Sequence, residues 1–350
     1  MKKMKRFSAL GMFTAVCFSM AMFAGCAEDA VQTTLETQES ERTFVTFAGE
    51  EYPSDISELN VGFAEITDED MRRITEFTGL KKLSLFNCNI SDITPISGLS
   101  ELTELDISQN MIEDISFLAE LTKLESLCLR GDRADDLSPL AEMNQLKELC
   151  VTVNSDNADF LSRMTGLETL VVFGSESDDI SFVSGLTELR SLTLYDFRVS
   201  DITYLAGLTN LQSLALSHFE ITDISPLLGL NELKELYLNR TRIDDISPLA
   251  QLSGLKELTI VNSDFSDITP LSEFSGLEKL DLSSNYIRDI GTVSELSGLK
   301  ELNLWNNHIS DISPIENLAA LDILDLRNND ISAEDIVELE KLLPDCMIQY

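Results

Sequence analysis

Histidine and tryptophan are scarce in this chain of 350 residues, which has two His and one Trp. The histidines, His218 and His308, are far apart in the sequence, so a histidine-based catalytic dyad or metal cluster lacks its residues. We find no G-x-S-x-G motif, no H-E-x-x-H motif and no glycine loop that would cradle a phosphate. The sequence therefore predicts neither an enzyme nor a bound cofactor.

Cysteines and basic residues are also few. After residue 26 only Cys88, Cys128, Cys150 and Cys346 remain, too few for a disulfide scaffold, and no later apolar run is long enough to span a bilayer. The chain has 25 Lys and Arg against 61 Asp and Glu. Nucleic acid is an unsuitable partner for such a surface, because its phosphates require basic contacts, whereas cationic partners and divalent ions are attracted.

The first 26 residues are typical of an export signal. A basic start (MKKMKRF) precedes an apolar stretch that ends at Phe23-Ala24-Gly25-Cys26. This ending resembles the lipobox of bacterial lipoproteins, with Phe23 in place of the usual Leu. It implies that Cys26 is lipidated, and that the protein is exported and anchored at the cell surface or the outer face of a bacterial membrane. An uncleaved anchor or a plain signal is the alternative. Residues 27–43 are polar and without periodicity, and they predict a flexible tether.

One aliphatic pattern recurs along the rest of the chain. In residues 299–318 (LKELNLWNNHISDISPIENL) apolar residues first alternate and then recur every third position, which no single helix or strand explains. The same pattern repeats every 22 residues, with one step of 21, in twelve copies within residues 80–331. The first residues of these copies are Leu80, Leu102, Leu124, Leu146, Leu167, Leu189, Leu211, Leu233, Leu255, Leu277, Leu299 and Leu321. A period of this length indicates a leucine-rich-repeat array.

The pattern predicts one coil of an α/β solenoid, a horseshoe with a parallel concave sheet. Positions one, four and six of a copy face inward from a short strand, and strands stack about 4.8 Å apart. Asn at position nine can satisfy backbone groups in the turn. Positions 11, 14, 17 and 20 return along the convex side in 3₁₀ or extended turns, which tolerate the Pro at position 16. No copy buries its apolar face alone, so neighbouring copies supply the core.

Caps are expected at both ends of the array. Residues 44–79 form the N-terminal cap and an atypical first repeat, with a strand at 44–47 (FVTF) and a helix at 67–77 that begins at Thr67 and buries Met71, Ile74 and Phe77. Residues 332–350 form a helical cap. Its helix (332–343) begins at Ser332 and turns Ile336, Leu339 and Leu342 inward.

The strings SDITPISGL, DDISPLAQL and SDISPIENL, each after an L-x-x-L-x-L-x-x-N-x-I pattern, resemble the 22-residue repeats of the internalin family of bacterial surface proteins. The resemblance covers residues 56–343. It implies a surface-displayed scaffold that binds a protein through its concave face. We find neither the Ig-like domain nor the C-terminal sorting motif that commonly accompany these repeats, so the resemblance implies binding without indicating a particular partner.

Positions three, five and seven of each strand are expected to be exposed on the concave face. Several carry aromatic residues, and two arginines lie at the adjoining edge; both residue types are enriched at binding hot spots. The candidate partner-binding residues are Phe86, Val171, Phe173, Tyr195, Arg198, Tyr237, Arg240 and Trp305. The alternative is that these are ordinary single exposed residues or that neighbours cover them.

Position 13 is Asp in nearly every copy, including Asp201, Asp223, Asp245, Asp267 and Asp289. A stacked column of carboxylates could bind Ca²⁺, but the stronger interpretation is that each Asp caps the turn that follows it. We therefore expect no metal.

Cys128 and Cys150 occupy the same strand position in adjacent copies. Their Cα atoms should lie close enough for a disulfide. Two unbonded thiols are the alternative, and the sequence leaves both states open.

Taken together, these patterns predict an exported, lipid-anchored scaffold that recognises a protein partner, in adhesion or another surface interaction. Binding of a cell-envelope or extracellular glycan is the alternative, because aromatic residues also stack on sugar rings. A structural role at the envelope without a discrete ligand is a third hypothesis.

Overall fold

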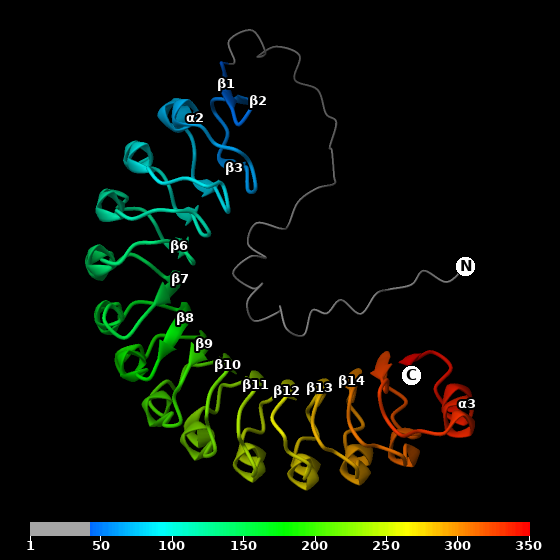
Figure 1. Cartoon of the computed structure of the whole chain (residues 1–350). Helices are drawn as coiled ribbons and strands as arrows, with labels where there is room; N and C mark the ends of the chain where they lie inside the picture. The colour runs from blue at the N-terminus through cyan, green and yellow to red at the C-terminus, as the bar shows by residue number, and fades with distance from the viewer. Residues whose placement is uncertain (1–42) are drawn as a thin grey trace. The chain divides into compact units, whose positions relative to one another are not determined.

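The computed structural model describes residues 43–350 (Figure 1). The predicted signal peptide with Cys26, and all of the predicted tether except Thr43, lie outside the described residues. The described chain forms two compact units, residues 43–173 and 174–350, which are treated separately below. Within residues 43–350, no helix has both the length and the apolar character needed to cross a bilayer.

Unit 1 begins with the predicted cap. The strand β1 (Phe44–Phe47) is confirmed, and it pairs with β2 (Glu50–Pro53) in an antiparallel hairpin that the sequence analysis did not predict. The predicted helix is also confirmed, as α2 (Asp68–Arg73) followed by the 3₁₀ turn η3 (Ile74–Glu76). Thr67 is its N-cap in a reciprocal capping box with Asp70, and Met71, Ile74 and Phe77 are buried.

The strands of unit 1 that follow the hairpin are parallel and lie in chain order. They are β3 (Glu58–Asn60), β4 (Lys82–Ser84), β5 (Glu104–Asp106), β6 (Ser126–Leu129), β7 (Glu148–Val153) and β8 (Thr169–Ser177), whose last residues belong to unit 2. Each copy returns through a short 3₁₀ helix, as predicted: η4 (Thr94–Gly98), η5 (Ser116–Glu120), η6 (Ser138–Glu142) and η7 (Asp159–Arg163).

Unit 2 repeats the arrangement. Its parallel strands are β9 (Ser191–Phe197), β10 (Ser213–Ser217), β11 (Glu235–Asn239), β12 (Glu257–Val261), β13 (Lys279–Asp281), β14 (Glu301–Asn303), β15 (Ile323–Asp325) and β16 (Met347–Gln349). The 3₁₀ turns are η8 (Ser181–Gly185), η9 (Thr203–Leu205), η10 (Ser225–Gly229), η11 (Ser247–Gln251), η12 (Thr269–Glu273), η13 (Gly291–Glu295) and η14 (Ser313–Ile315). Neighbouring strands pair so that equivalent positions of successive copies lie side by side: Leu214 is paired with Leu236, and Leu236 with Leu258.

The core of each unit lies between the sheet and the 3₁₀ turns. The repeated aliphatic positions are almost fully buried: Leu299, Leu302 and Leu304 are at 0% exposure. In Figure 1 the strands of each unit line the inner side of its ribbon and the turns line the outer side. The sheet face that points away from the core is called the open face here.

Asparagine at position nine connects successive copies, as predicted. The Asn307 side chain donates to the carbonyls of Leu282 and Leu304 at 3.0 and 3.1 Å, and its Oδ1 accepts the backbone N–H of Ile287. Asn110 and Asn285 donate to the equivalent carbonyls, and their Oδ1 atoms accept the backbone N–H groups of Ile90 and Ser263 respectively. Asn154 does not make these bonds, because its side chain accepts backbone N–H groups of the local turn at residues 156 and 157 instead.

The C-terminal cap differs in two details from the prediction. The helix α3 (Ala333–Leu342) starts at the expected N-cap Ser332 and buries Ile336 and Leu339, but Leu342 is 48% exposed, so its assignment to the inner face was wrong. After the helix the chain returns as β16, which extends the parallel sheet beside β15. The leucine-rich-repeat fold with a parallel sheet, 3₁₀ turns and helical caps is thereby confirmed.

Candidate functional site

The open face is built from three rows of side chains, at positions three, five and seven of each strand. Position five was expected to be exposed, but this middle row is largely covered. Val171 is 4% exposed, Cys150 is 5% exposed and Ala215 is 4% exposed. Strand neighbours stack so closely along the row that each side chain is shielded by those beside it. Val171 was therefore wrongly predicted to be accessible to a partner.

Two aromatic contacts occupy the open face of unit 1. Phe86 packs edge to face against Phe63, with ring centroids 5.0 Å apart, and Phe63 is 74% exposed. Further along, the guanidinium of Arg130 lies 3.9 Å above the ring centroid of Phe173, a cation–π contact across β6 and β8. Phe86 and Phe173 are thus partly covered by neighbours that the sequence analysis did not associate with them.

In unit 2, three charged or polar side chains form a chain of hydrogen bonds at the C-terminal ends of β9, β10 and β11. His218 Nδ1 contacts Asp196 Oδ1, and Arg240 Nη1 lies 2.8 Å from His218 Nε2. A guanidinium can only donate, so Nε2 accepts, and the imidazole carries its proton on Nδ1 and donates it to Asp196. The orientation of the exposed Arg240 is thereby fixed.

All three members occupy position eight of their copies, where the backbone is left-handed. Their φ angles are 61°, 63° and 53° for Asp196, His218 and Arg240. Elsewhere this position is often Asn or Gly, such as Asn262 and Gly131, which tolerate positive φ better than Arg does. The three side chains in this strained backbone conformation are bonded to one another, which is the basis for the hypothesis that they have a function.

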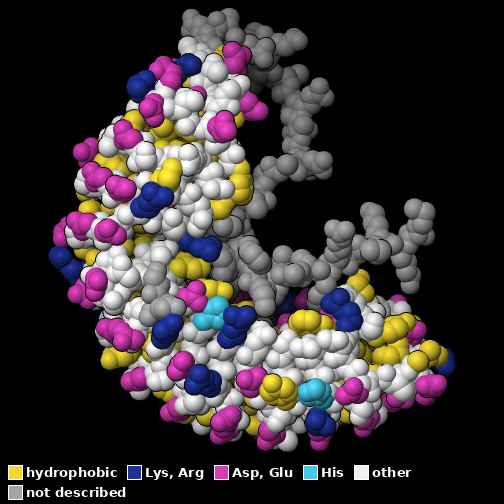
Figure 2. All heavy atoms as spheres, viewed as in Figure 1, with side chains coloured by type: hydrophobic (Ala, Val, Ile, Leu, Met, Phe, Trp, Pro, Cys, Tyr) yellow, Lys and Arg dark blue, Asp and Glu magenta, His cyan; other side chains and the backbone are white. Residues whose placement is uncertain are grey.

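Tyrosines flank this chain. The Tyr195 ring packs against His218 with centroids 5.1 Å apart. Tyr237 is half-buried in the middle row, and burial, with the neighbouring Tyr195, raises its pKa to about 12. Arg198 is exposed at position ten of its copy. We name Asp196, His218 and Arg240, together with Tyr195 at position seven, the position-eight cluster. On the face drawn in Figure 2, acidic side chains are more numerous than basic ones.

Tyr195, Tyr237 and Arg240 were predicted as site residues, whereas Asp196 and His218 were missed. His218 was considered only in order to exclude a histidine-based catalytic dyad or metal cluster. The sequence carries one signal for this cluster: the residue at position eight is Asp, His and Arg in three successive copies, where Asn or Gly is common in the others.

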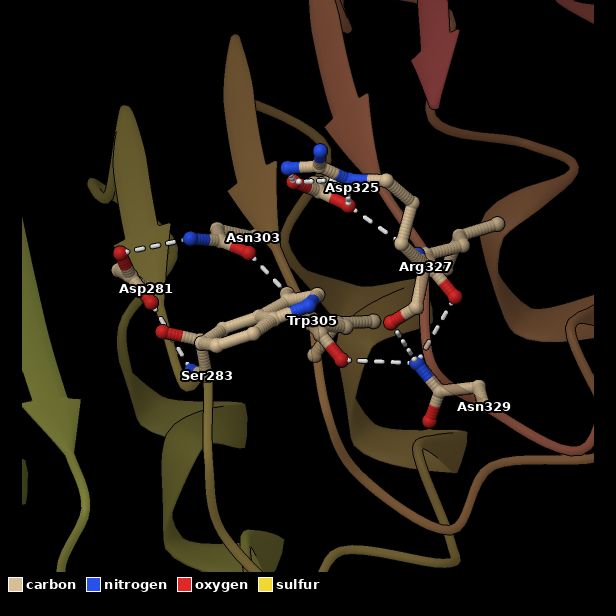
Figure 3. A network of polar contacts seen from close by, with 9 residues as sticks. Asp281, Ser283, Asn303, Trp305, Asp325, Arg327 and Asn329 are labelled. Atoms are coloured by element: carbon tan, nitrogen blue, oxygen red, sulfur yellow. Dashed lines mark hydrogen bonds and ion pairs between the residues drawn. The ribbon is translucent and has the colours of Figure 1, made fainter. Parts of the chain in front are cut away.

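Trp305 lies near the C-terminal end of unit 2 within a polar network (Figure 3). It is 41% exposed, and its backbone N–H donates to Asn303 Oδ1 at 3.0 Å. Asn303 Nδ2 donates to Asp281 Oδ2 at 2.8 Å. On the next strand, Asp325 accepts from the backbone and the guanidinium of Arg327. The indole therefore lies between fixed carboxylate, amide and guanidinium groups.

The aspartates at position 13 act as turn caps. Asp201, Asp223, Asp245, Asp267 and Asp289 each accept the backbone N–H two residues later, at 2.8 to 2.9 Å. These bonds and those from neighbouring hydroxyls lower the pKa of several of them, Asp245 included. Within residues 43–350 no group of His, Cys, Asp and Glu side chains has the geometry to hold a metal ion. The capping interpretation accounts for this column.

Cys128 and Cys150 are paired in the register of β6 and β7, as predicted, and both are free thiols without a disulfide. The hydrogen bond with Cys128, together with burial, raises the pKa of the Cys150 thiol well above its ordinary range. A protonated, buried thiol reacts slowly with oxidants. Whether the pair forms a disulfide stays a hypothesis.

Cys88 is buried in the turn, where its backbone N–H donates to Asn110.

Comparison with known proteins matches the repeats to established models and structures. The family model described as Leucine Rich repeats (2 copies) matches residues 78–120, 100–142 and 209–251, and the model described as Leucine rich repeat matches residues 275–331. The crystal structure of an internalin (inlF) from Listeria monocytogenes is 33% identical, with a TM-score of 0.71, over 86% of this chain and 89% of that one.

Two more distant structures share the fold alone. A leucine-rich-repeat protein of Leptospira interrogans is 20% identical, with a TM-score of 0.58, over 85% of this chain and 90% of that one. Mouse RP105, solved in complex with MD-1, is 23% identical, with a TM-score of 0.62, over 81% of this chain and 53% of that one. No curated protein matches the chain at a significant level.

Proposed function

The chain belongs to the internalin family of bacterial leucine-rich-repeat proteins, and on this premise we propose that it binds a protein partner through its open face. The observation that carries this proposal is the position-eight cluster. Arg240 is exposed and bonded to His218, and Tyr195 packs against the same histidine. Arginine and tyrosine are among the residue types that dominate binding energy at protein interfaces.

The fixed geometry of Arg240 supports this role. Ordering a long, flexible side chain at an interface costs about 0.5–1.5 kcal/mol, and part of that cost is avoided when the side chain is already oriented. Arg240 is bonded to His218 in the free protein. Its other N–H groups can form bidentate bonds to a carboxylate or to backbone carbonyls of a partner.

The proposal is tested by screening the purified protein against arrays of secreted and cell-surface proteins, and then measuring each hit with variants. Arg240→Asn keeps a residue type that tolerates the left-handed backbone, and Tyr195→Ser removes the aromatic surface. Each should weaken binding at least about tenfold, which corresponds to 1.4 kcal/mol. Tyr286→Ser is the matched control, because Tyr286 is 54% exposed and lies outside the cluster. Equal affinities for all three variants would refute the proposed site.

We also propose that the protein is exported and lipid-anchored through Cys26. The residues before Cys26 support this, because they combine a basic start, an apolar stretch and small residues at the break. The test is to express the full chain and a Cys26→Ala variant in a bacterium and to separate membranes from soluble protein. The parent should partition with membranes and the variant should not. Identical partitioning would contradict the anchor.

A further inference from the structure

Trp305 and its neighbours differ in character from the position-eight cluster. In the three repeats that contain β13, β14 and β15, the residues at positions five and seven are Asp281, Ser283, Asn303, Trp305, Asp325 and Arg327. Apart from Trp305, all are polar or charged. Trp and Arg are also enriched at protein interfaces, so residue type alone does not separate this row from the position-eight cluster. What distinguishes it is a single exposed indole bordered by hydrogen-bonding side chains on the neighbouring strands.

These polar groups are fixed before any ligand arrives. Asp281 Oδ1 accepts the backbone N–H of Ser283 at 2.9 Å, while its Oδ2 accepts from Asn303. Asp325 is only 2% exposed, and it holds Arg327 through both carboxylate oxygens, leaving the Arg327 side chain about half exposed at 49%. Acceptors and donors therefore lie on either side of the indole in defined positions (Figure 3).

This combination fits one class of ligand. A sugar ring presents an apolar C–H face that can lie on an indole, and its hydroxyl groups both donate and accept hydrogen bonds. Carboxylate acceptors and amide and guanidinium donors beside the ring match that requirement. The protein carries a formal charge of −36, so an anionic polysaccharide would be repelled and a neutral glycan would not.

We propose that Trp305, with Asp281, Asn303 and Arg327, forms a binding site for a neutral oligosaccharide. The site is separate from the position-eight cluster and does not depend on the protein partner proposed above. The single tryptophan of the chain makes the site directly observable, because all indole fluorescence of the protein comes from Trp305.

The test is to titrate the purified protein with chitohexaose, cellohexaose and maltohexaose while recording tryptophan emission. At least one should give a saturable change in emission. Calorimetry with that sugar should then show at least a tenfold loss of affinity for Trp305→Ala, retention within a few fold for Trp305→Phe, and no change for Tyr286→Ala. Thermal melts of the variants identify any loss of folding.

Three results would overturn the proposal: no emission change with any of these neutral sugars, unchanged affinity of Trp305→Ala, or an emission change produced by heparin alone. The last result would point to an anionic ligand held by Arg327. Because Trp305→Phe keeps an aromatic face, loss of binding in that variant while it remains folded would also contradict stacking as the source of affinity.

Discussion

Asn110 and Asp132 occupy the same turn position in consecutive repeats, and the Asp132 carboxylate accepts the backbone N–H of Asn110 at 3.1 Å. Asn110 uses its Nδ2 to donate to the carbonyls of Leu85 and Ile107. The corresponding atom of Asp132, Oδ2, cannot donate when ionised, and it is buried without a hydrogen-bond partner. Burial raises the pKa of Asp132 to about 7. A carboxyl group thus occupies a position where the fold favours an amide.

Asp132→Asn should stabilise the protein at neutral and alkaline pH. Because the pKa is raised in the folded state, the stability linked to protonation is complete below the unfolded value of about 3.9 and is lost as pH rises through about 7. The variant should gain about 1–3 kcal/mol at pH ~8, as an unsatisfied group is replaced by a donor, and clearly less at pH ~4.

Urea denaturation of both proteins at the two pH values measures this difference. Asp135→Asn is the matched control, because Asp135 is exposed in the same turn and should show no such pH dependence. A variant that is less stable than the parent at pH ~8 would contradict the assignment.

The asparagine connection between repeats should be costly to remove. Asn307→Ala deletes the bonds to the carbonyls of Leu282 and Leu304 and the acceptor for Ile287 N–H, and it leaves these buried groups unsatisfied. We expect a loss of about 2–4 kcal/mol in the free energy of unfolding. The adjacent Asn306 is exposed with φ at 57°, so Asn306→Gly should change stability by less than about 1 kcal/mol. If denaturation shows equal effects of the two substitutions, the asparagine connection between repeats does not contribute the expected stability.

The periodic features of this fold could be predicted from the sequence because each copy repeats the same physical requirement. Aliphatic residues at positions one, four and six and Asp at position 13 perform one task in most copies, so alignment of the copies reveals the task. Asn at position nine recurs in fewer copies but is still visible in the alignment. Val171 shows where this reasoning fails. Alternation on a strand predicts which face a side chain occupies, but it does not predict shielding by neighbours along the row.

The position-eight cluster shows a second limit. Asp196, His218 and Arg240 are each 22 residues apart and differ in type, so no repeated pattern connects them. Their contact depends on register and on a left-handed backbone that both become visible only in the structure. Non-repeating contacts across repeats are therefore the part of the proposed site that periodicity cannot predict.

Gly174→Ala should destabilise unit 2 by overpacking. A Cβ at residue 174 would lie 2.8 Å from two ring atoms of Phe197, which is fully buried between Phe182 and Phe219. The expected loss is about 1–3 kcal/mol. Phe197→Leu removes the clashing ring, so the double variant should be more stable than the sum of the single effects predicts. Gly229→Ala, with 3.7 Å to its nearest neighbour, is the matched control. Strict additivity in thermal melts would exclude the steric explanation.

The aspartates at position 13 should stabilise the turns as ionised caps, without calcium. Asp245 Oδ1 accepts the backbone N–H of Ser247 at 2.8 Å, and Oδ2 accepts from the Ser247 hydroxyl at 2.9 Å. These bonds lower the pKa of Asp245. A depressed pKa in the folded state gives stability that is present above the unfolded value of about 3.9 and is lost as pH falls through the folded value.

Asp245→Ala should therefore lower the melting midpoint at pH ~7 and have a smaller effect below pH ~3. Asp244→Ala is the control, since no cap bond involves the preceding residue. Melting midpoints should be equal with calcium and with a chelator; a midpoint raised by calcium and insensitive to Asp245→Ala would show that the column binds an ion instead.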